Sequence, residues 1–255
     1  MLGCHEPEID QSPSIETQKI ADYYNRWFDI VPADTPALRE KAYRLRYQVY
    51  CCEHEYETPE EHPQQLEMDP FDCRSIHSLI IDRASGAATG TVRLILPDQN
   101  APGESFPVQK MCNHPLLSEV ASRAAEVSRF AISKKLRKMV EGCLDVEGNQ
   151  YASGKYLKIS LVLGLMKATL QMSFQYGIAD WFAVMEPSLL RLLSRFGICF
   201  TPIGPLIEHH GFRQPCHANV STLLERVRQE HFDLWEFVTE SSRSSCCRKL
   251  GDTAA

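Results

Sequence analysis

The chain has 255 residues, which is enough for one large α/β domain or two small domains. Its apolar fraction of 44% and its charged fraction of 24% are ordinary for a globular protein in water. The net charge of −6 argues against general nucleic-acid binding, which calls for a basic surface. The most apolar segment, 159–170, is too short to span a bilayer and contains Ser160 and Lys167, so we expect no transmembrane helix and leave peripheral membrane contact open.

The first half of the chain predicts two helices, a strand and a long loop. A helix over 18–27 leads into a strand over 28–32. A second helix starts at Thr35, a typical N-cap, with Pro36 at its first position. Arg46 and Tyr50 lie four residues apart at the border of its apolar stripe, so they share a face. The acidic segment 53–72 is predicted to be an irregular loop. The apolar stripe is formed by Leu38, Ala42, Leu45 and Val49.

The second half predicts a sheet with helices packed on it. Strands over 77–82 and 88–96 flank the turn 83–86, and a helix near 116–125 precedes a strand over 126–133. The longest helix, 156–176, is apolar nearly all round, which indicates that a sheet covers it. A strand over 180–185, a helix over 187–196, strands over 199–203 and 206–210 and a helix over 221–232 follow. This order predicts a mixed α/β sheet with helices on both faces.

The chain ends and the cysteines say little about function. Segments 1–15 and 241–255 are polar and are predicted to be disordered, which leaves a single domain over 16–240. The ten cysteines follow no secreted-domain pattern and no apolar leader precedes them, so we expect free thiols in a reducing cytoplasm. We expect no catalytic cysteine, because no cysteine stands in a recognisable local motif. We also expect no metal site, because the two candidate groups lack zinc-ligand spacing: Cys51, Cys52 and His54, and His209, His210, Cys216 and His217.

Six charged residues stand in or beside segments that the pattern predicts to be buried. Buried charges are costly unless they are paired or used in chemistry. Three arginines and three acids within one stretch of the chain therefore suggest one shared site. They are Arg46, Asp69, Asp72, Arg93, Glu126 and Arg129.

Glu126 is the candidate general base, because a carboxylate in a central strand can serve as one if burial raises its pKa towards neutrality. The alternative is a structural ion pair at the start of a strand. Arg129 follows three residues later, and residues three apart in a regular strand point to opposite faces. We therefore predict a bulge or kink that lets Glu126 and Arg129 share a pocket.

Arg93 and the basic run after the 126–133 strand each have two interpretations. Arg93 is either an edge residue with its charge in solvent or the partner of Asp69 and Asp72, in a network that pins the loop over a pocket. The run is either a solvated loop or a docking patch for a negatively charged partner or phosphates. The amides that begin the 156–176 helix could also hold a phosphate. The residues concerned are Lys134, Lys135, Arg137 and Lys138, and Ser153, Gly154 and Lys155.

Taken in order, these residues resemble the autoinducer-synthase branch of the GNAT N-acyltransferases, which includes acyl-homoserine-lactone synthases and N-acyl amino acid synthases. That pattern has an arginine four residues before an aromatic residue, an Asp-x-x-Asp loop, a strand arginine and a Glu-x-Ser-Arg-Phe strand. More narrowly, 47–51 and 126–133 are similar to acyltransferases of bacterial exosortase (PEP-CTERM) sorting systems. The spacing holds over roughly residues 35–135, and the matching residues are Arg46, Tyr50, Asp69, Asp72, Arg93, Glu126, Ser128, Arg129 and Phe130.

The resemblance implies a GNAT fold in which the parallel strands 126–133 and 180–185 splay apart around an acyl thioester. Glu126, through a water, would take a proton from the ammonium of a small acceptor so that the free amine can attack. A backbone amide of the first strand would polarise the thioester carbonyl. Arg129 and Arg93 would hold the acceptor carboxylate or order the loop of Asp69 and Asp72.

Two departures from the family pattern bear on the substrates. The lactone synthases usually carry a tryptophan soon after the aromatic residue, whereas 51–58 offers only Tyr56. That favours an amino acid over S-adenosylmethionine as acceptor. The usual GNAT pyrophosphate loop, Arg/Gln-x-x-Gly-x-Gly/Ala, is absent after Ser133. That favours an acyl carrier protein over coenzyme A as donor.

The implied partners are an acidic acyl carrier protein, which the 134–138 run suits, and a small amine. No tightly bound cofactor is implied, only the acyl thioester as co-substrate. Three alternatives stay open: a lactone synthase that uses S-adenosylmethionine, a coenzyme A-dependent acetyltransferase, and a catalytically idle GNAT domain that binds acyl groups. Candidates for the wall of an acyl tunnel are Phe130, Ile132, Met166 and Phe182.

Overall fold

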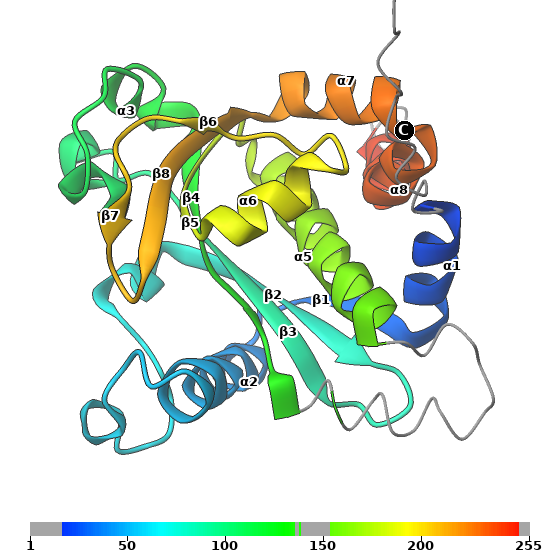
Figure 1. Ribbon diagram of the computed structural model, residues 1–255, viewed down its shortest axis with the longest axis horizontal. Helices are drawn as coiled ribbons and strands as arrows, with labels where there is room; N and C mark the ends of the chain where they lie inside the picture. Colours follow the sequence, from blue (N-terminus) through cyan, green and yellow to red (C-terminus); the bar gives the residue numbers. More distant parts are fainter. Residues whose placement is uncertain (1–16, 136–137, 139–153, 250–255) are drawn as a thin grey trace, which may run out of the picture.

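A mixed eight-stranded sheet forms the centre of the molecule (Figure 1). The computed structural model describes residues 17–135, 138 and 154–249. Along the sheet the strand order is β1-β2-β3-β4-β5-β8-β6, and β7 pairs with β8 beside this path. The strands are β1 (Phe28–Pro32), β2 (Ser75–Asp82), β3 (Ala88–Ile95), β4 (Ala124–Ile132), β5 (Asp180–Met185), β6 (Thr201–Pro202), β7 (Ile207–Glu208) and β8 (Phe212–Asn219).

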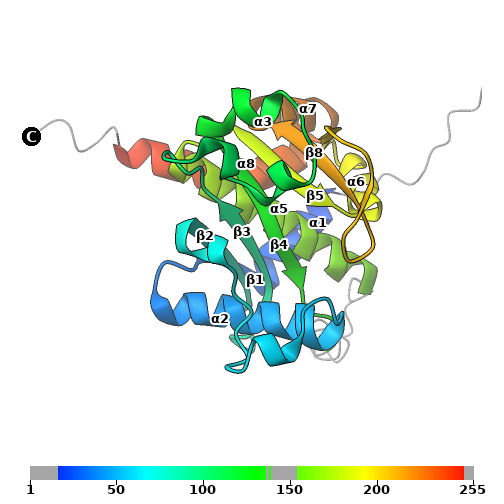
Figure 2. The same cartoon turned by 90° about the vertical axis from the view of Figure 1, so that its left-hand side faces the viewer.

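Helices cover both faces of the sheet, as the sequence predicts. On one face a single large core joins the sheet to α1, α5, α6, α7 and α8. On the other face α2 packs on β2, β3 and β4 (Figure 2). The helices are α1 (Thr17–Trp27), α2 (Pro36–Tyr47), α3 (Leu116–Glu119), α5 (Gly154–Tyr176), α6 (Pro187–Ser194), α7 (Val220–Glu230) and α8 (Phe232–Lys249).

Helix α5 is the central helix of the large core. By length and composition its segment Tyr156–Tyr176 could cross a membrane, but 83% of the apolar window is buried inside the fold. Its apolar side chains pack on the sheet and on α1 and α8. We therefore interpret α5 as a core helix, in agreement with the prediction that a sheet covers it.

Strands β4 and β5 are the parallel pair, and their pairing stops partway. The last paired residues are Val127 and Ala183, although β4 continues to Ile132. Beyond this point the backbone of β4 no longer pairs with β5, so the two strands splay. The other edge of β4 continues to pair with β3 as far as Ile132 opposite Gly90.

A bulge in β4 lies directly after the last residue paired with β5. Arg93 of β3 stands opposite Ser128, but Thr91 stands opposite Ala131, so β4 carries one extra residue between them. Arg129 takes up this residue with a φ of 48°, a left-handed conformation that is rare outside glycine. The predicted bulge or kink is thereby confirmed. The extra residue is Arg129 itself, at the end of the interval from Glu126 to Arg129, rather than a residue between the two.

Several predicted elements differ from the structure. The strand predicted over 199–203 shortens to β6, and the one over 206–210 shortens to β7. The segment predicted as a helix over 116–125 divides into α3, a 3-10 turn over Ala121–Arg123 and the start of β4. Helix α8 runs to Lys249, within the segment predicted to be a disordered tail.

Strand β8 was missed because Pro215 lies in its middle, and proline normally argues against a central strand. Pro215 is opposite Val184 of β5, and its carbonyl accepts the Ile203 N–H at 3.0 Å. Pro215 lacks an N–H, but its position on β8 lies beyond the last residue that pairs with the short strand β6, so no strand hydrogen bond to β6 is lost there.

Gly164 of α5 provides a test of the packing between α5 and α1. A methyl group added at Gly164 would overlap the ring of Tyr24, which is buried. We expect Gly164→Ala to lower the free energy of unfolding by about 1 to 3 kcal/mol, as overpacking does. Urea denaturation would measure the change. Gly103→Ala, where nothing lies within 4 Å of the added methyl, is the control and should be close to neutral.

Candidate active site

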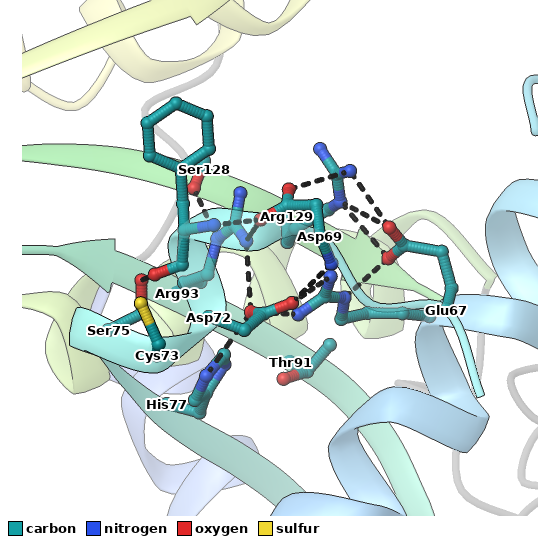
Figure 3. A network of polar contacts seen from close by, with 12 residues as sticks. Glu67, Asp69, Asp72, Cys73, Ser75, His77, Thr91, Arg93, Ser128 and Arg129 are labelled. Atoms are coloured by element: carbon teal, nitrogen blue, oxygen red, sulfur yellow. Dashed lines mark hydrogen bonds and ion pairs between the residues drawn. The ribbon is translucent and has the colours of Figure 1, made fainter. Parts of the chain in front are cut away.

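Arg46 of α2 forms the innermost part of a network of charged side chains. Figure 3 shows its carboxylate partners, Glu67 and Asp72, from close by. Its side chain is 0% exposed, so its charge must be matched inside the protein. Its two terminal nitrogens bind Asp72 in a bidentate pair at 2.7 and 3.0 Å. Its Nε donates to Glu67. Two carboxylates from the loop before β2 thus lie on one helix arginine.

The Asp-x-x-Asp motif forms a capping box at the start of the 3-10 turn Pro70–Arg74. Asp69 accepts the N–H of Phe71 at 2.9 Å, and Asp72 accepts the N–H of Asp69 at 2.8 Å. Each carboxylate therefore holds the turn and also receives arginine nitrogens. The spacing of three residues is what this reciprocal capping requires.

Arg93 connects the turn to the sheet. Its Nη1 donates to Asp69 at 2.7 Å and to Asp72 at 2.9 Å, and its Nε donates to Ser128 at 2.9 Å. Of the two interpretations of Arg93, the partner of Asp69 and Asp72 is confirmed. His77 lies opposite Arg93 on β2, and its Nε2 is 3.5 Å from Asp72. Burial lowers the pKa of His77 to about 4, so this ring is neutral near pH 7.

Arg129 lies at the outer side of the network, with 21% of its side chain exposed. Its Nε and Nη2 bind Glu67 at 2.8 to 3.2 Å, and Nη2 also lies 3.1 Å from Asp69. The guanidinium stacks over Tyr50 at 5.2 Å from the ring centroid. The bulge in β4 thus brings Arg129 into the same network as Arg93 of the neighbouring strand β3.

Three arginines of the network face four carboxylates, because Glu57 also lies 3.7 Å from Nη2 of Arg129, beside the pairs with Glu67, Asp69 and Asp72. Burial raises the pKa of Glu67, but the hydrogen bonds and charges of Arg46 and Arg129 outweigh it and lower that pKa to about 2. Burial also raises the pKa of Asp72, but Arg46 and Arg93 outweigh this effect and hold that pKa well below its ordinary value. The carboxylates of Glu67 and Asp72 are therefore charged near pH 7.

Glu67 is the residue that the sequence interpretation missed. The interpretation counted Asp69, Asp72 and Glu126 as the acids of the shared site and took Glu126 as the base, so it named no further acid for Arg46 and Arg129. That acid is Glu67, whose backbone N–H also bonds the carbonyl of Tyr43 at 3.2 Å. A count of charges could not have found Glu67, because three arginines already stood against three acids, and nothing local distinguishes it from the other acids of the loop.

Glu126 lies beside the network but in different surroundings. It is 3% exposed, and the neighbouring 3-10 turn Pro107–Lys110 belongs to a small apolar cluster that covers this part of the sheet. Its Oε2 accepts the N–H of Val108 at 2.8 Å. Burial raises the pKa of Glu126 to about 7, despite the opposing effects of Val108, Arg93 and Arg129. Such a carboxyl can exchange a proton near neutral pH.

A group of aromatic and basic side chains joins the two halves of the sheet beyond the splay. Tyr56, from the loop after α2, stacks on His210, from the turn between β7 and β8, with centroids 5.0 Å apart. Arg213 of β8 lies over the same Tyr56 ring at 5.8 Å. His54 packs on Tyr56 at 4.9 Å. Tyr56 is thus a contact between the halves rather than a free aromatic face.

The predicted tunnel residues lie on two faces of the sheet. Because the bulge reverses the alternation of β4, Phe130 and Ile132 pack with the α5 core, which also contains Met166. Phe182 belongs to the small cluster on the face of Glu126. A tunnel that touches all four would have to pass between the splayed strands.

Only part of the predicted basic patch can be placed. Ser133, Lys134 and Lys135 follow β4, and the carboxylate of Glu53 accepts the Ser133 hydroxyl at 2.6 Å and the Lys134 N–H at 2.7 Å. Lys134, Lys135 and Lys138 are exposed. Arg137 and Ser153 lie outside the described residues, and of Gly154 and Lys155 only the backbone is described.

Comparison with known proteins agrees with the fold. Residues 45–141 match the sequence model described as an acetyltransferase (GNAT) domain. That stretch begins at Leu45, near the end of α2, and includes every residue of the charged network. No curated protein sequence matches the chain.

Solved structures superpose over most of the chain. TofI, in a ternary complex with an inhibitor and MTA, gives a TM-score of 0.55 at 18% identity over 78% of this chain and 95% of TofI. MesI, a CoA-dependent acyl-homoserine lactone synthase, gives 0.53 at 18% identity over 79% and 93% of the two chains. FeeM, an N-acyl amino acid synthase from uncultured soil microbes, gives 0.49 at 15% identity over 80% and 97%. The chain carries a GNAT domain, and the predicted α/β GNAT fold is confirmed.

Removing the charge of Glu67 should destabilise the protein strongly. Glu67→Gln leaves Arg46 and Arg129 without full charge compensation, and breaking such a buried pair typically costs about 3 to 5 kcal/mol. Urea denaturation at pH 7 would measure the loss. Glu60→Gln, which removes an exposed acid from the same loop, is the control and should change stability little.

The same interaction predicts an acid limb in the stability of the wild type. Because the pKa of Glu67 falls from about 4.5 in the unfolded chain to about 2 in the fold, its contribution is complete above pH 4.5 and is lost as the pH falls towards 2. The difference in unfolding free energy between wild type and Glu67→Gln should shrink over that range. A difference that stays constant would contradict this role for Glu67.

Proposed function

We propose that this protein is an N-acyltransferase that moves a fatty acyl group from an acyl thioester to the amine of a small acceptor, most simply an amino acid. The observation that carries the proposal is Glu126, a carboxyl with a pKa of about 7 next to the opening between β4 and β5. The GNAT domain supports acyl transfer as the class of reaction. The finer choices of donor and acceptor rest on the resemblance and on the charges around the site.

Glu126 is the proposed base. Its Oε2 is held by Val108, whereas Oε1 accepts no hydrogen bond from the residues that the structure describes. Oε1 can therefore take a proton from the acceptor ammonium, through a water because the side chain is buried. The neutral amine then attacks the thioester carbon to form a C–N bond. The C–S bond breaks, and the thiolate leaves and takes up a proton.

The splay between β4 and β5 is the proposed place for the thioester. Backbone groups of β4 beyond Val127 have lost β5 as a partner, so an amide there is free to donate to the thioester oxygen as negative charge develops. The strands supply this donor because the bulge at Arg129 bends β4 away from its neighbour.

Arg129 is the proposed contact for an acceptor carboxylate. Arg46 is fully buried and Arg93 is 1% exposed, so neither can reach a ligand without rearrangement of the network. Arg129 is 21% exposed, and its Nη1 binds none of the described residues. Arg46, Arg93, Asp69 and Asp72 then organise the site by fixing the loop, and Tyr50 supports the guanidinium of Arg129.

An acyl carrier protein is the proposed donor, and cytoplasm is the proposed location. Exposed Lys134, Lys135 and Lys138 offer positive charge at the end of β4 to an acidic partner, in a protein with a net charge of −6. The link to exosortase systems rests on the resemblance alone. Mass spectrometry of lipids from cells that express the chain separates the acceptors: an N-acyl amino acid supports the proposal, and an acyl lactone supports the lactone-synthase alternative.

Replacing the proposed base should abolish turnover but preserve the fold. Glu126→Gln keeps an oxygen for the Val108 N–H and removes the ionisable group. We expect the rate of acyl transfer to fall at least 100-fold, in line with the loss of a general base. The temperature of unfolding should not fall, because a carboxylate that is costly to bury becomes a neutral amide. Turnover like that of the wild type would reject Glu126 as the base.

The pH dependence of the wild type provides a second test. A base must be deprotonated to act, so kcat/KM should rise with pH through about 7 and level off above it. Steady-state kinetics between pH 5.5 and 9 would show this rise in kcat/KM, because that range extends about 1.5 to 2 units to either side of the midpoint. A flat profile across this range would contradict the assignment.

Charge reversal of the exposed lysines tests the donor. Lys134, Lys135 and Lys138 changed together to Glu should lower kcat/KM for acyl carrier protein about 10-fold or more, by weakening association. The rate with free acyl-coenzyme A should change much less. Equal losses for the two donors would contradict carrier-protein docking at this place. Reversal of Lys158, Arg191 and Arg195 together, three exposed basic residues elsewhere on the surface, is the control with the same change in net charge.

A further inference from the structure

A single side chain joins the segment that covers Glu126. Gln109, in the turn Pro107–Lys110, accepts the N–H of Phe106 at 2.8 Å through Oε1. Its Nε2 donates to the carbonyl of Pro102 at 2.9 Å and approaches that of Leu117 at 3.4 Å. One amide group therefore connects three points of the segment that lies over the base.

The turn that Gln109 holds presents one amide to Glu126. Pro107 has no N–H, so the first N–H of the turn belongs to Val108, and no carbonyl within the turn is placed to accept it. That N–H donates to Oε2 of Glu126 at 2.8 Å. Phe106 and Val108 are fully buried, which fixes the turn against the sheet. The direction of the Val108 amide thus depends on the turn, and the turn depends on Gln109.

We propose that Gln109 is a positioning residue that fixes the Val108 amide against Glu126 and thereby sets the pH at which the proposed base ionises. The inference rests on the proposed function only for its catalytic meaning, since the hydrogen bonds exist whatever the reaction. A donor to a carboxylate favours the charged form, so its loss makes Glu126 harder to ionise.

Other charged and titratable groups act on Glu126 from the elements around it, and they remain in place when Gln109 is changed. Arg93 on β3 and Arg129 on β4 favour its charged form, and Asp69 from the loop opposes it. Cys112 and Cys216 also interact electrostatically with it, from the segment after the turn and from β8. His217 of β8 lies across Phe182 on the same face and bonds Asp180.

The test is a direct titration of Glu126 by carbon NMR of protein with labelled glutamate carboxyls. Comparison with Glu126→Gln identifies its signal. Two variants remove the interaction in different ways. Gln109→Met keeps the size of the side chain but cannot make its three contacts, and Val108→Pro deletes the donor itself at a position with helical backbone. Lys110→Ala, an exposed neighbour in the same turn, is the matched control.

We expect the midpoint of Glu126 to rise by about one pH unit in both variants and to stay unchanged in Lys110→Ala. At pH 7, kcat/KM should then fall about fivefold, whereas near pH 9 it should recover most of the wild-type value. Gln109→Met with an unchanged midpoint overturns the proposal, including the case in which only its stability falls. A shift in Val108→Pro alone also overturns it, because Gln109 would then not control the amide.

The two proposals can fail separately. If the wild type transfers no acyl group but the midpoint moves in both variants, the positioning role of Gln109 stands and the proposed function fails. If acyl transfer is present and depends on Glu126, but the midpoint does not move in Gln109→Met, the proposed function stands and the role of Gln109 fails.

Discussion

The burial of the Arg46 guanidinium is the constraint on which the site depends. A fully buried cation needs carboxylates, and the chain supplies them from the long segment that follows α2 and leads to β2. Because Asp72 and Glu67 must reach Arg46, the loop is drawn across the sheet. Asp69 then meets Arg93, and Glu67 meets Arg129. The geometry beside the opening of β4 and β5 follows from this one requirement.

The two kinds of buried carboxyl in this region differ because their surroundings differ. Glu67 and Asp72 receive guanidinium groups directly, and their pKa values are lowered. Glu126 receives one backbone amide within apolar surroundings, and its pKa is raised. Separation of this kind lets one carboxylate hold structure at all physiological pH values and the other exchange protons. The arginines therefore act on Glu126 from a distance rather than by pairing with it.

Local patterns in the sequence were enough to predict the order of most elements, the Asp-x-x-Asp loop and the contacts of Arg93 with Asp69 and Asp72. They also required a bulge near Arg129, which backbone geometry confirms. Long-range choices were not predictable in this way. Glu67 looks like any other acid of its loop, and only its distance from Arg46 and Arg129 in the fold distinguishes it. Strand β8 was missed because Pro215, in its middle, argues against a strand. The packing of the turn Pro107–Lys110 over Glu126 depends on long-range contacts, which hydrophobic periodicity does not indicate.

The π-helical turn Gln48–Glu53, which continues α2, has a consequence for how this chain can vary in length. The N–H of His54 bonds the carbonyl of Val49, five residues back, so this turn holds one residue more than an α-helical turn. Within it the carbonyl of Tyr50 accepts the N–H groups of Tyr56 and Glu57. Deleting one residue here would restore an ordinary α-helix and rotate the residues after the deletion by about 100° around the helix axis. Tyr50 or its successors would then turn away from Arg129, so the register of this single turn couples helix length to the shape of the site.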